Sequence, residues 1–378
     1  MRIHLRRALA GVAILGVVTS GSLRAQGQIP GEDNTAYGTT SAEFLLLGAG
    51  ARGAALGSGF AAIVTDPTSL YWNPAGAAEM LRPGVSFSTY DYLADTRYSW
   101  GGLAFPFNDG QSTIGVQFGT FGFSDQPNYT LADPEGDGTT YSVSESFVGL
   151  TFAQNFSDRF SAGLTGKYIS DKLGKTSATG FAVDFGTSFH TLVAEKPLRA
   201  SFVIANLGGT LQHSGVGLDV NVNRTPPPGQ ESLPQDPQPA RYQAEGFGLP
   251  VVFRIGLAYD FMSSAVTRVT VLGNFEQPSN RGLTGGGGVE WAFTDIGQSG
   301  FTVMARGSYD YQADNNVGPT GAAGFGTDLW ATEDLDGLAL GGGIMFDRGA
   351  TFGLGLDYAY RHMGVLGGTH VFSATLHW

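Results

Sequence analysis

Hydrophobic residues alternate with polar or small residues over most of this chain, from residue 85 to residue 378. In the last segment Phe372 and Leu376 fall on one face, whereas Ser373 and His377 fall on the other. Successive side chains of a β-strand point to opposite faces, so a period of two predicts strands that are hydrophobic on one side only. This pattern constrains the fold more than any other feature, because every such strand needs a place for its hydrophobic face.

The alternating pattern divides into fourteen segments, an even number. Most of them exceed the length of about five or six residues that is usual for strands, and about 9–11 residues let a tilted strand cross a membrane. Aromatic residues gather near the segment ends, as in the interfacial girdles of membrane barrels. The segments are 85–92, 97–107, 111–123, 143–155, 159–172, 178–192, 197–206, 249–261, 265–277, 281–294, 300–313, 337–347, 350–361 and 368–378.

Two architectures accommodate such strands. In a soluble sandwich the hydrophobic face forms the core, whereas in an outer-membrane barrel it meets lipid and the polar face lines the lumen. The connections favour the barrel, because short turns and long loops alternate, as they do on the periplasmic and outer sides of such barrels. The connections 108–110, 156–158, 193–196, 262–264, 295–299 and 348–349 are short and share one side; the long ones, 124–142, 207–248 and 314–336, share the other, where 93–96 is a short exception. We therefore predict an all-β fold, a 14-stranded antiparallel transmembrane β-barrel over residues 85–378 that contacts outer-membrane lipid.

The composition agrees with a surface that does not face water everywhere. Charged residues make up 14% of the chain, against about 25% in soluble domains, and the chain contains 58 glycines and 26 phenylalanines. The absence of cysteine excludes disulfides, thiol chemistry and a lipid anchor on cysteine. With 33 acidic against 21 basic residues, the chain is not expected to bind nucleic acid.

Residues 1–25 have the layout of a secretory signal peptide. Arg2, Arg6 and Arg7 precede a hydrophobic run of about eleven residues, which is too short to cross a membrane as a helix. Removal of this segment leaves 17 basic and 33 acidic residues in the mature chain. We expect export to the outer membrane of a Gram-negative (diderm) bacterium, with residues 26–41 as an extended periplasmic segment.

Residues 42–84 do not alternate, and their first half is rich in alanine, leucine and glycine. The pairs Asp66-Pro67 and Asn73-Pro74 each place an N-capping residue before a proline, which is tolerated at the first helical position. These pairs predict short helical turns that end at Tyr71 and at Met80. A compact helical segment that precedes a barrel fits best inside the lumen, so we predict a plug.

Residues 42–80 closely resemble the N-terminal region of the PorV/PorQ family of outer-membrane proteins. These proteins are distant relatives of FadL-type fatty-acid channels, which share the Asn-Pro-Ala-Gly element found here at residues 73–76. Residues 205–208 and 249–261 also resemble the family, so the likeness covers nearly the whole mature chain. It implies a fourteen-stranded barrel, in agreement with the count of alternating segments. The proline-rich insertion at 224–240 departs from the family pattern.

The resemblance implies a non-enzymatic role in type IX secretion, in which the barrel handles or anchors exported cargo. Outer loops 207–248 and 314–336 would then contact cargo proteins or secretion-system components. In the second loop Phe325, Leu329 and Trp330 are the candidate partner residues, since exposed hydrophobic side chains mark many interaction sites.

A FadL-like transporter of long-chain fatty acids or other hydrophobic small molecules is the alternative function. A hydrophobic ligand would then bind in the lumen, and the plug motif formed by Asp66, Asn73, Pro74 and Gly76 would act as the gate. A plain diffusion barrel is a third alternative, but a plug that fills the lumen argues against it.

Other chemical motifs are weak. Residues 48–53 match G-x-G-x-x-G, but no strand–helix–strand unit surrounds them. The histidines lack the spacing of metal ligands. We therefore expect no cofactor, no metal and no catalytic residue. Charged residues on the inward face are expected to pair across the lumen and against the plug. They are Lys167, Arg254, Arg268, Glu276, Arg306, Asp310, Asp357 and Arg361.

Overall fold

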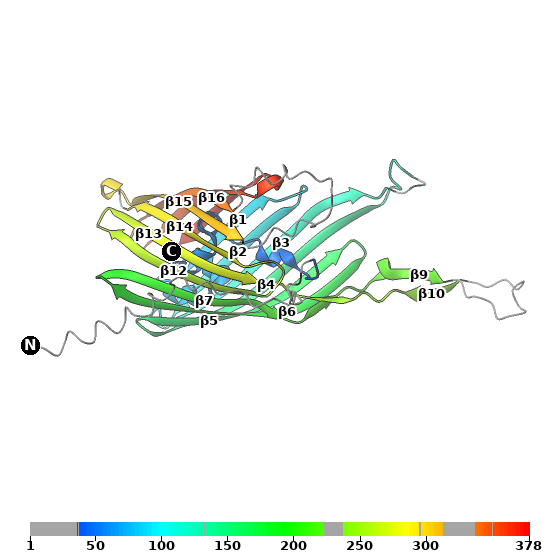
Figure 1. Cartoon of the computed structure of the whole chain (residues 1–378), viewed down its shortest axis with the longest axis horizontal. Coiled ribbons are helices and arrows are strands. Elements are labelled where there is room, and N and C mark those ends of the chain that lie inside the picture. Colours follow the sequence, from blue (N-terminus) through cyan, green and yellow to red (C-terminus); the bar gives the residue numbers. More distant parts are fainter. Residues whose placement is uncertain are drawn as a thin grey trace, which may run out of the picture. The chain divides into compact units, whose positions relative to one another are not determined.

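Fourteen antiparallel strands close into a barrel in this computed structural model, which describes residues 36, 38–129, 131, 133–222, 237–294, 296–312, 337–349 and 351–378 (Figure 1). Each barrel strand pairs with its neighbours along the chain, β1 pairs with β18 to close the ring, and β7 pairs with β12 across a long connection. The predicted fold class, a closed fourteen-stranded antiparallel β-barrel, is confirmed.

The barrel strands extend from the region of the short turns to that of the long connections. The longest, β4 and β6, have 18 residues each. The strands are β1 (Gly84–Asp91), β2 (Arg97–Phe107), β3 (Ser112–Pro127), β4 (Thr140–Ser157), β5 (Phe160–Leu173), β6 (Thr176–Val193), β7 (Lys196–Gly208), β12 (Val252–Ser263), β13 (Thr267–Pro278), β14 (Thr284–Phe293), β15 (Phe301–Gln312), β16 (Leu338–Asp347), β17 (Gly353–His362) and β18 (Gly368–His377).

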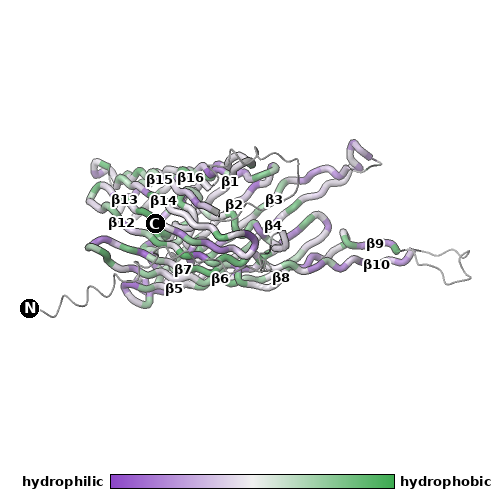
Figure 2. Tube along the Cα trace, viewed as in Figure 1, coloured by the Kyte–Doolittle hydropathy of each residue, from purple (hydrophilic) through white to green (hydrophobic). Residues whose placement is uncertain are grey.

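Most of the large hydrophobic side chains of the barrel strands point outward. Leu150 on β4 is 67% exposed and Leu356 on β17 is 57% exposed, whereas Thr151 beside the first is buried. Figure 2 shows hydrophobic and hydrophilic residues following one another along these strands. An outward hydrophobic face requires a solvent other than water, so the soluble-sandwich architecture is excluded.

Short helical elements occupy the interior of the barrel. They are η1 (Glu43–Leu46), α1 (Ala51–Leu56), η2 (Gly57–Ala62), α2 (Ser69–Trp72) and η3 (Pro74–Glu79). Most of their residues are buried, and they pack against strands from both halves of the ring, for example η3 against β5 and α1 against β16. We call residues 42–80 the plug.

The two proline-led turns of the plug differ slightly from the prediction. Helix α2 begins at Ser69, because the carboxylate of Asp66 accepts a hydrogen bond from the amide of Thr68 (2.8 Å) and so holds Pro67 and Thr68 in a turn. Asn73 caps η3 as predicted, since its side chain accepts a hydrogen bond from the amide of Ala75 (3.1 Å).

Glycines in the wall let the plug approach the strands closely. A Cβ atom on Gly186 of β6 would lie 2.2 Å from Oδ1 of Asn73, and one on Gly163 of β5 would lie 2.5 Å from the carbonyl carbon of Pro74. Any larger residue at either position would force the plug backbone away from the wall. These contacts give the inward-facing glycines of the strands a direct packing role.

The long connection between β7 and β12 contains secondary structure where a plain loop was expected at 207–248. Strands β8 (Thr210–Gln212) and β11 (Gly246–Gly248) pair with each other, and so do β9 (Asp219–Val222) and β10 (Gln238–Arg241). These strands are only three or four residues long, so their alternation is too short to be seen in the sequence. In the second pair the hydrogen bond from Arg241 lowers the pKa of Asp219.

Three further 3-10 turns, η4 (Val216–Leu218), η5 (Ile296–Gln298) and η8 (Gly364–Leu366), lie in connections. No helix in the described part of the chain has both the length and the hydrophobicity needed to cross a membrane. The predicted signal peptide at 1–25, residues 26–35 of the extended segment and the loop 314–336 with Phe325, Leu329 and Trp330 lie outside the described residues.

Candidate functional site

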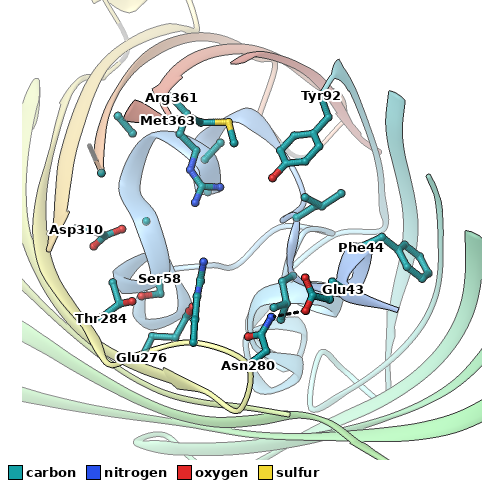
Figure 3. A pocket seen from close by; sticks show the side chains of 18 of the residues that line it. Glu43, Phe44, Ser58, Tyr92, Glu276, Asn280, Thr284, Asp310, Arg361 and Met363 are labelled. Carbon is teal, nitrogen blue, oxygen red and sulfur yellow. Dashed lines mark hydrogen bonds and ion pairs between the residues drawn. The ribbon is translucent and has the colours of Figure 1, made fainter. Parts of the chain in front are cut away.

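A cavity of about 890 Å³ lies between the plug and the end of the barrel that carries the long connections. Plug residues such as Phe44, Leu47 and Trp72 form part of its lining, and side chains from at least eight barrel strands form the rest (Figure 3). Its volume falls within the range of about 300–1,000 Å³ that is usual for small-molecule sites. We call it the plug cavity.

One side of the plug cavity is aromatic. Tyr92 follows β1 and packs edge-to-face against Phe121 of β3, with ring centroids 6.1 Å apart. Phe44 of the plug packs against Phe147 of β4, with centroids 6.1 Å apart, and is 3% exposed. Figure 3 shows Phe44 and Tyr92 on the same side of the cavity. This side offers rings against which an apolar group can pack.

The opposite side is polar and charged. Glu276 of β13 accepts hydrogen bonds from Nε of Arg254 (2.8 Å) and Nη2 of Arg281 (3.0 Å). Asp310 of β15 accepts one from Asn274 (2.8 Å) and lies with Glu276 away from the aromatic rings (Figure 3). The plug cavity therefore has two chemically different faces, which suits a molecule that is itself part apolar and part polar.

Below the plug cavity, a buried ion network ties the plug to the wall. The guanidinium of Arg52 binds both carboxylate oxygens of Glu290, each at 2.9 Å, and Arg306 donates to Oε2 of Glu290 at 2.7 Å. Arg306 also pairs with Asp357. Glu290 is 1% exposed, so its charge depends on these partners for stabilisation.

The predicted inward charges do point inward, but most pair with neighbouring strands and not across the lumen. The plug stands between opposite walls, so only adjacent strands and the plug itself are within reach. Among the described residues Lys167 pairs with Asp184, Arg254 with Glu276, Arg268 with Glu290, and Arg306 with Glu290 and Asp357.

Sequence reasoning missed Glu290 and Arg52 as members of this network. The alternation of β14 places Glu290 on its inward face, and Arg52 is the one charged residue in the small-residue run 44–65 of the plug. Both signals were therefore present in the sequence. The pairing of the two residues was not, because it joins positions 238 residues apart.

The predicted gate residues lie in the core of the plug. Asn73 is fully buried and donates to the carbonyls of Ala61 (3.0 Å) and Thr187 (3.2 Å), the second of which belongs to β6. A Cβ atom on Gly76 would lie 2.2 Å from the carbonyl oxygen of Val64. Pro74 faces Gly163 and Gly186 of the wall, as described above. Asp66 faces Arg52, with Oδ2 and Nη1 3.5 Å apart.

A second cavity, of about 750 Å³, lies at the short-turn end of the barrel. Its lining includes Glu79 at the end of η3 and His190 of β6, which are 2.8 Å apart. It shares no described lining residue with the plug cavity, and the gate residues line neither of the two. The plug core thus separates the two spaces.

Comparisons with known proteins identify the fold. No family model and no curated protein matches the chain, so the PorV/PorQ resemblance stays a prediction. A solved structure described as a TodX deltaS2S3 mutant monoaromatic hydrocarbon channel is 11% identical over 87% of this chain and 98% of that chain, with a TM-score of 0.51. The CymD monoaromatic hydrocarbon channel is 12% identical over 88% of this chain and 97% of that chain, with a TM-score of 0.50. At this identity the two similarities show the fold alone: a closed fourteen-stranded β-barrel with a short helical segment near its N-terminal end.

Proposed function

We propose that this chain is a non-enzymatic outer-membrane channel that admits small hydrophobic or amphipathic organic molecules. The observation that carries this proposal is the plug cavity, a space of about 890 Å³ with an aromatic side, placed directly on a plug that fills the lumen. In this arrangement a molecule arriving at the long-connection end binds next to the plug, and the plug then yields to let it pass toward the short-turn end.

Two further observations support the proposal. The outward hydrophobic belt of the barrel suits a lipid environment, and the alternation of long connections and short turns suits an outer membrane with the long connections outside. The two fold neighbours named above are described as hydrocarbon channels. We infer from the same pattern that Asp66, Asn73, Pro74 and Gly76 form the part of the plug that must rearrange.

Uptake by intact cells tests the proposal. The protein is expressed in a bacterial strain that lacks its own fatty-acid channel, so that lipopolysaccharide remains the barrier to hydrophobic solutes. Uptake of a radiolabelled monoaromatic hydrocarbon and of a radiolabelled fatty acid is then compared with that of cells carrying an empty vector. The proposal expects that cells expressing the protein take up at least one of the two probes faster than the empty-vector cells do. If the two kinds of cell take up each probe at the same rate, the proposal is contradicted.

A role in type IX secretion, as implied by the resemblance to PorV/PorQ proteins, is the second candidate. The observation in its favour is the extension formed by β8 to β11, where Tyr242 is 67% exposed and Val216 is 63% exposed. Deleting residues 314–336, which include Phe325, Leu329 and Trp330, should then leave barrel assembly intact but reduce co-purification of partner proteins from native membranes. Unchanged co-purification would count against this role.

A further inference from the structure

The aromatic side of the plug cavity also contains an unpaired carboxylate. Glu145 lies on the inward face of β4, directly opposite Phe121 of β3, and lines the cavity with Phe44 and Tyr92. Its carboxylate makes no hydrogen bond or ion pair with any described residue. A carboxylate beside aromatic rings, with no cation to compensate it, is an unusual feature in the lumen of a barrel whose other acids are mostly paired.

The surroundings of Glu145 add negative charge. Its direct neighbour on β5 is Asp171, and the charged groups that act on it most strongly are Asp171 and Glu43, both acidic. Like charges directly opposite each other on adjacent strands destabilise a sheet. His213 binds one carboxylate oxygen of Asp171 (3.1 Å), but the other, Oδ1, is buried without a partner, and Asp171 as a whole is 4% exposed.

The connections at this end of the barrel have the same sign. The described parts of the long connections 124–142 and 207–248 contain six acidic residues and one lysine or arginine. A surface and a cleft that carry charge of one sign raise the local concentration of ions of the opposite sign. A positively charged molecule is therefore drawn toward the cavity in which Glu145 has no partner.

Arg361 of β17 also lines the plug cavity, and its positive charge would favour an anionic ligand. Its guanidinium points into the plug cavity (Figure 3) and makes no ion pair within the described part of the chain. However, the carboxylate of Asp310 on β15 lines the same cavity and interacts electrostatically with Arg361. Arg361 therefore has an acidic group near it among the described residues, whereas the two charged groups that act most strongly on Glu145 are both acidic.

We infer that the plug cavity takes molecules that carry a positively charged ammonium group on an aromatic or aliphatic body. The ammonium group sits against Glu145 and the faces of Phe121 and Tyr92, because aromatic faces attract cations and the carboxylate supplies the opposite charge. The apolar body packs between Phe44 and the remaining rings. This inference rests on the proposed function and adds that, among the molecules admitted, the plug cavity prefers organic cations.

Three phenyl-bearing probes of similar size but different charge test the inference. They are phenethylammonium, 2-phenylethanol and 3-phenylpropanoate, and their binding to the purified full-length mature protein in lipid nanodiscs is measured by calorimetry. We expect the cation to bind about tenfold more tightly than the alcohol, which corresponds to about 1.4 kcal/mol. The anion should bind most weakly.

Variants locate the charge that produces this preference. Glu145→Gln should reduce the ratio of cation to alcohol affinity by about tenfold. Glu195→Gln removes the same charge from the exposed turn between β6 and β7, at the opposite end of the barrel, and should leave the ratio unchanged. Phe121→Leu keeps the carboxylate but removes a ring, so it should lower the ratio of cation to alcohol affinity by a smaller factor. This variant tests the inference if Glu145→Gln does not fold.

The outcomes separate this inference from the proposed function. Equal binding of the three probes, or a preference that survives in Glu145→Gln, overturns the cation inference and leaves a channel for hydrophobic molecules in place. Stronger binding of the anion overturns it as well and assigns the site to Arg361. Failure of all three probes to bind overturns both proposals.

Discussion

At the scale of single residues, Asn73 does more than cap a helix. Its amide group donates to the carbonyls of Ala61 and Thr187 while its oxygen accepts from the amide of Ala75. Asn73→Asp keeps the capping acceptor but loses the amide donor of both hydrogen bonds, so we expect it to destabilise the plug by about 2–3 kcal/mol. Native-state hydrogen exchange of the Ala75 amide measures this change. A neutral Asn73→Asp would mean that capping is the whole role of this side chain.

Glu290 is the residue whose loss should cost the most stability. It is 1% exposed and binds both Arg52 and Arg306, so Glu290→Gln leaves these two guanidinium groups with only their second partners, Asp66 and Asp357. We expect the free energy of unfolding to fall by about 3–5 kcal/mol, as measured by denaturation with guanidinium chloride in detergent micelles. Arg97→Gln breaks the exposed pair with Asp91 and is the control, for which no measurable change is expected. Equal stability of the two variants would show that the buried network contributes nothing.

At the scale of elements, the plug must move if it gates the channel. A Cβ atom on Gly59 of η2 would lie 3.6 Å from that of Asn274 on β13, a spacing that suits a disulfide, and the chain has no cysteine of its own. We expect oxidised Gly59→Cys/Asn274→Cys protein to lose most uptake of the labelled probes and to regain it on reduction. Uptake that is unaffected by the cross-link would show that passage does not require this part of the plug to leave the wall.

A cross-link outside the plug is the control for this experiment. Gly246→Cys/Thr210→Cys joins β11 to β8, where the corresponding Cβ atoms are 3.5 Å apart. It should form a disulfide equally well and leave uptake unchanged in both redox states.

At the scale of the whole molecule, the solvent around the barrel decides how a substitution on its outer face changes the free energy of unfolding. Leu150 is 67% exposed on the outer face of β4, whereas Leu131 is 105% exposed in the β3–β4 connection. Leu150→Lys should destabilise the barrel by about 2–4 kcal/mol because it places a charge in lipid, while Leu131→Lys should have no effect. The unfolding free energies of both variants in lipid vesicles check this. In water the two substitutions would be equally harmless.

The sequence by itself determined the number of barrel strands and the face that each turns outward. A period of two is a local property, so segments such as 350–361 and 368–378 could be placed within a few residues of β17 and β18. The proline-led turns of the plug were visible for the same reason, since capping by Asn73 depends only on the next two residues. Strands β8 to β11 could not be predicted from the sequence, because they are too short to show a period of two.

Only the tertiary structure decided which inward side chains meet. Closing the ring brings β1 against β18 and seats Arg52 on Glu290, and these contacts join positions hundreds of residues apart. The isolation of Glu145 is likewise a property of the assembled lumen, because a missing partner is defined by everything that surrounds the carboxylate. The alternation of a strand predicts that a residue points inward. Only the folded barrel determines which other side chains that residue contacts.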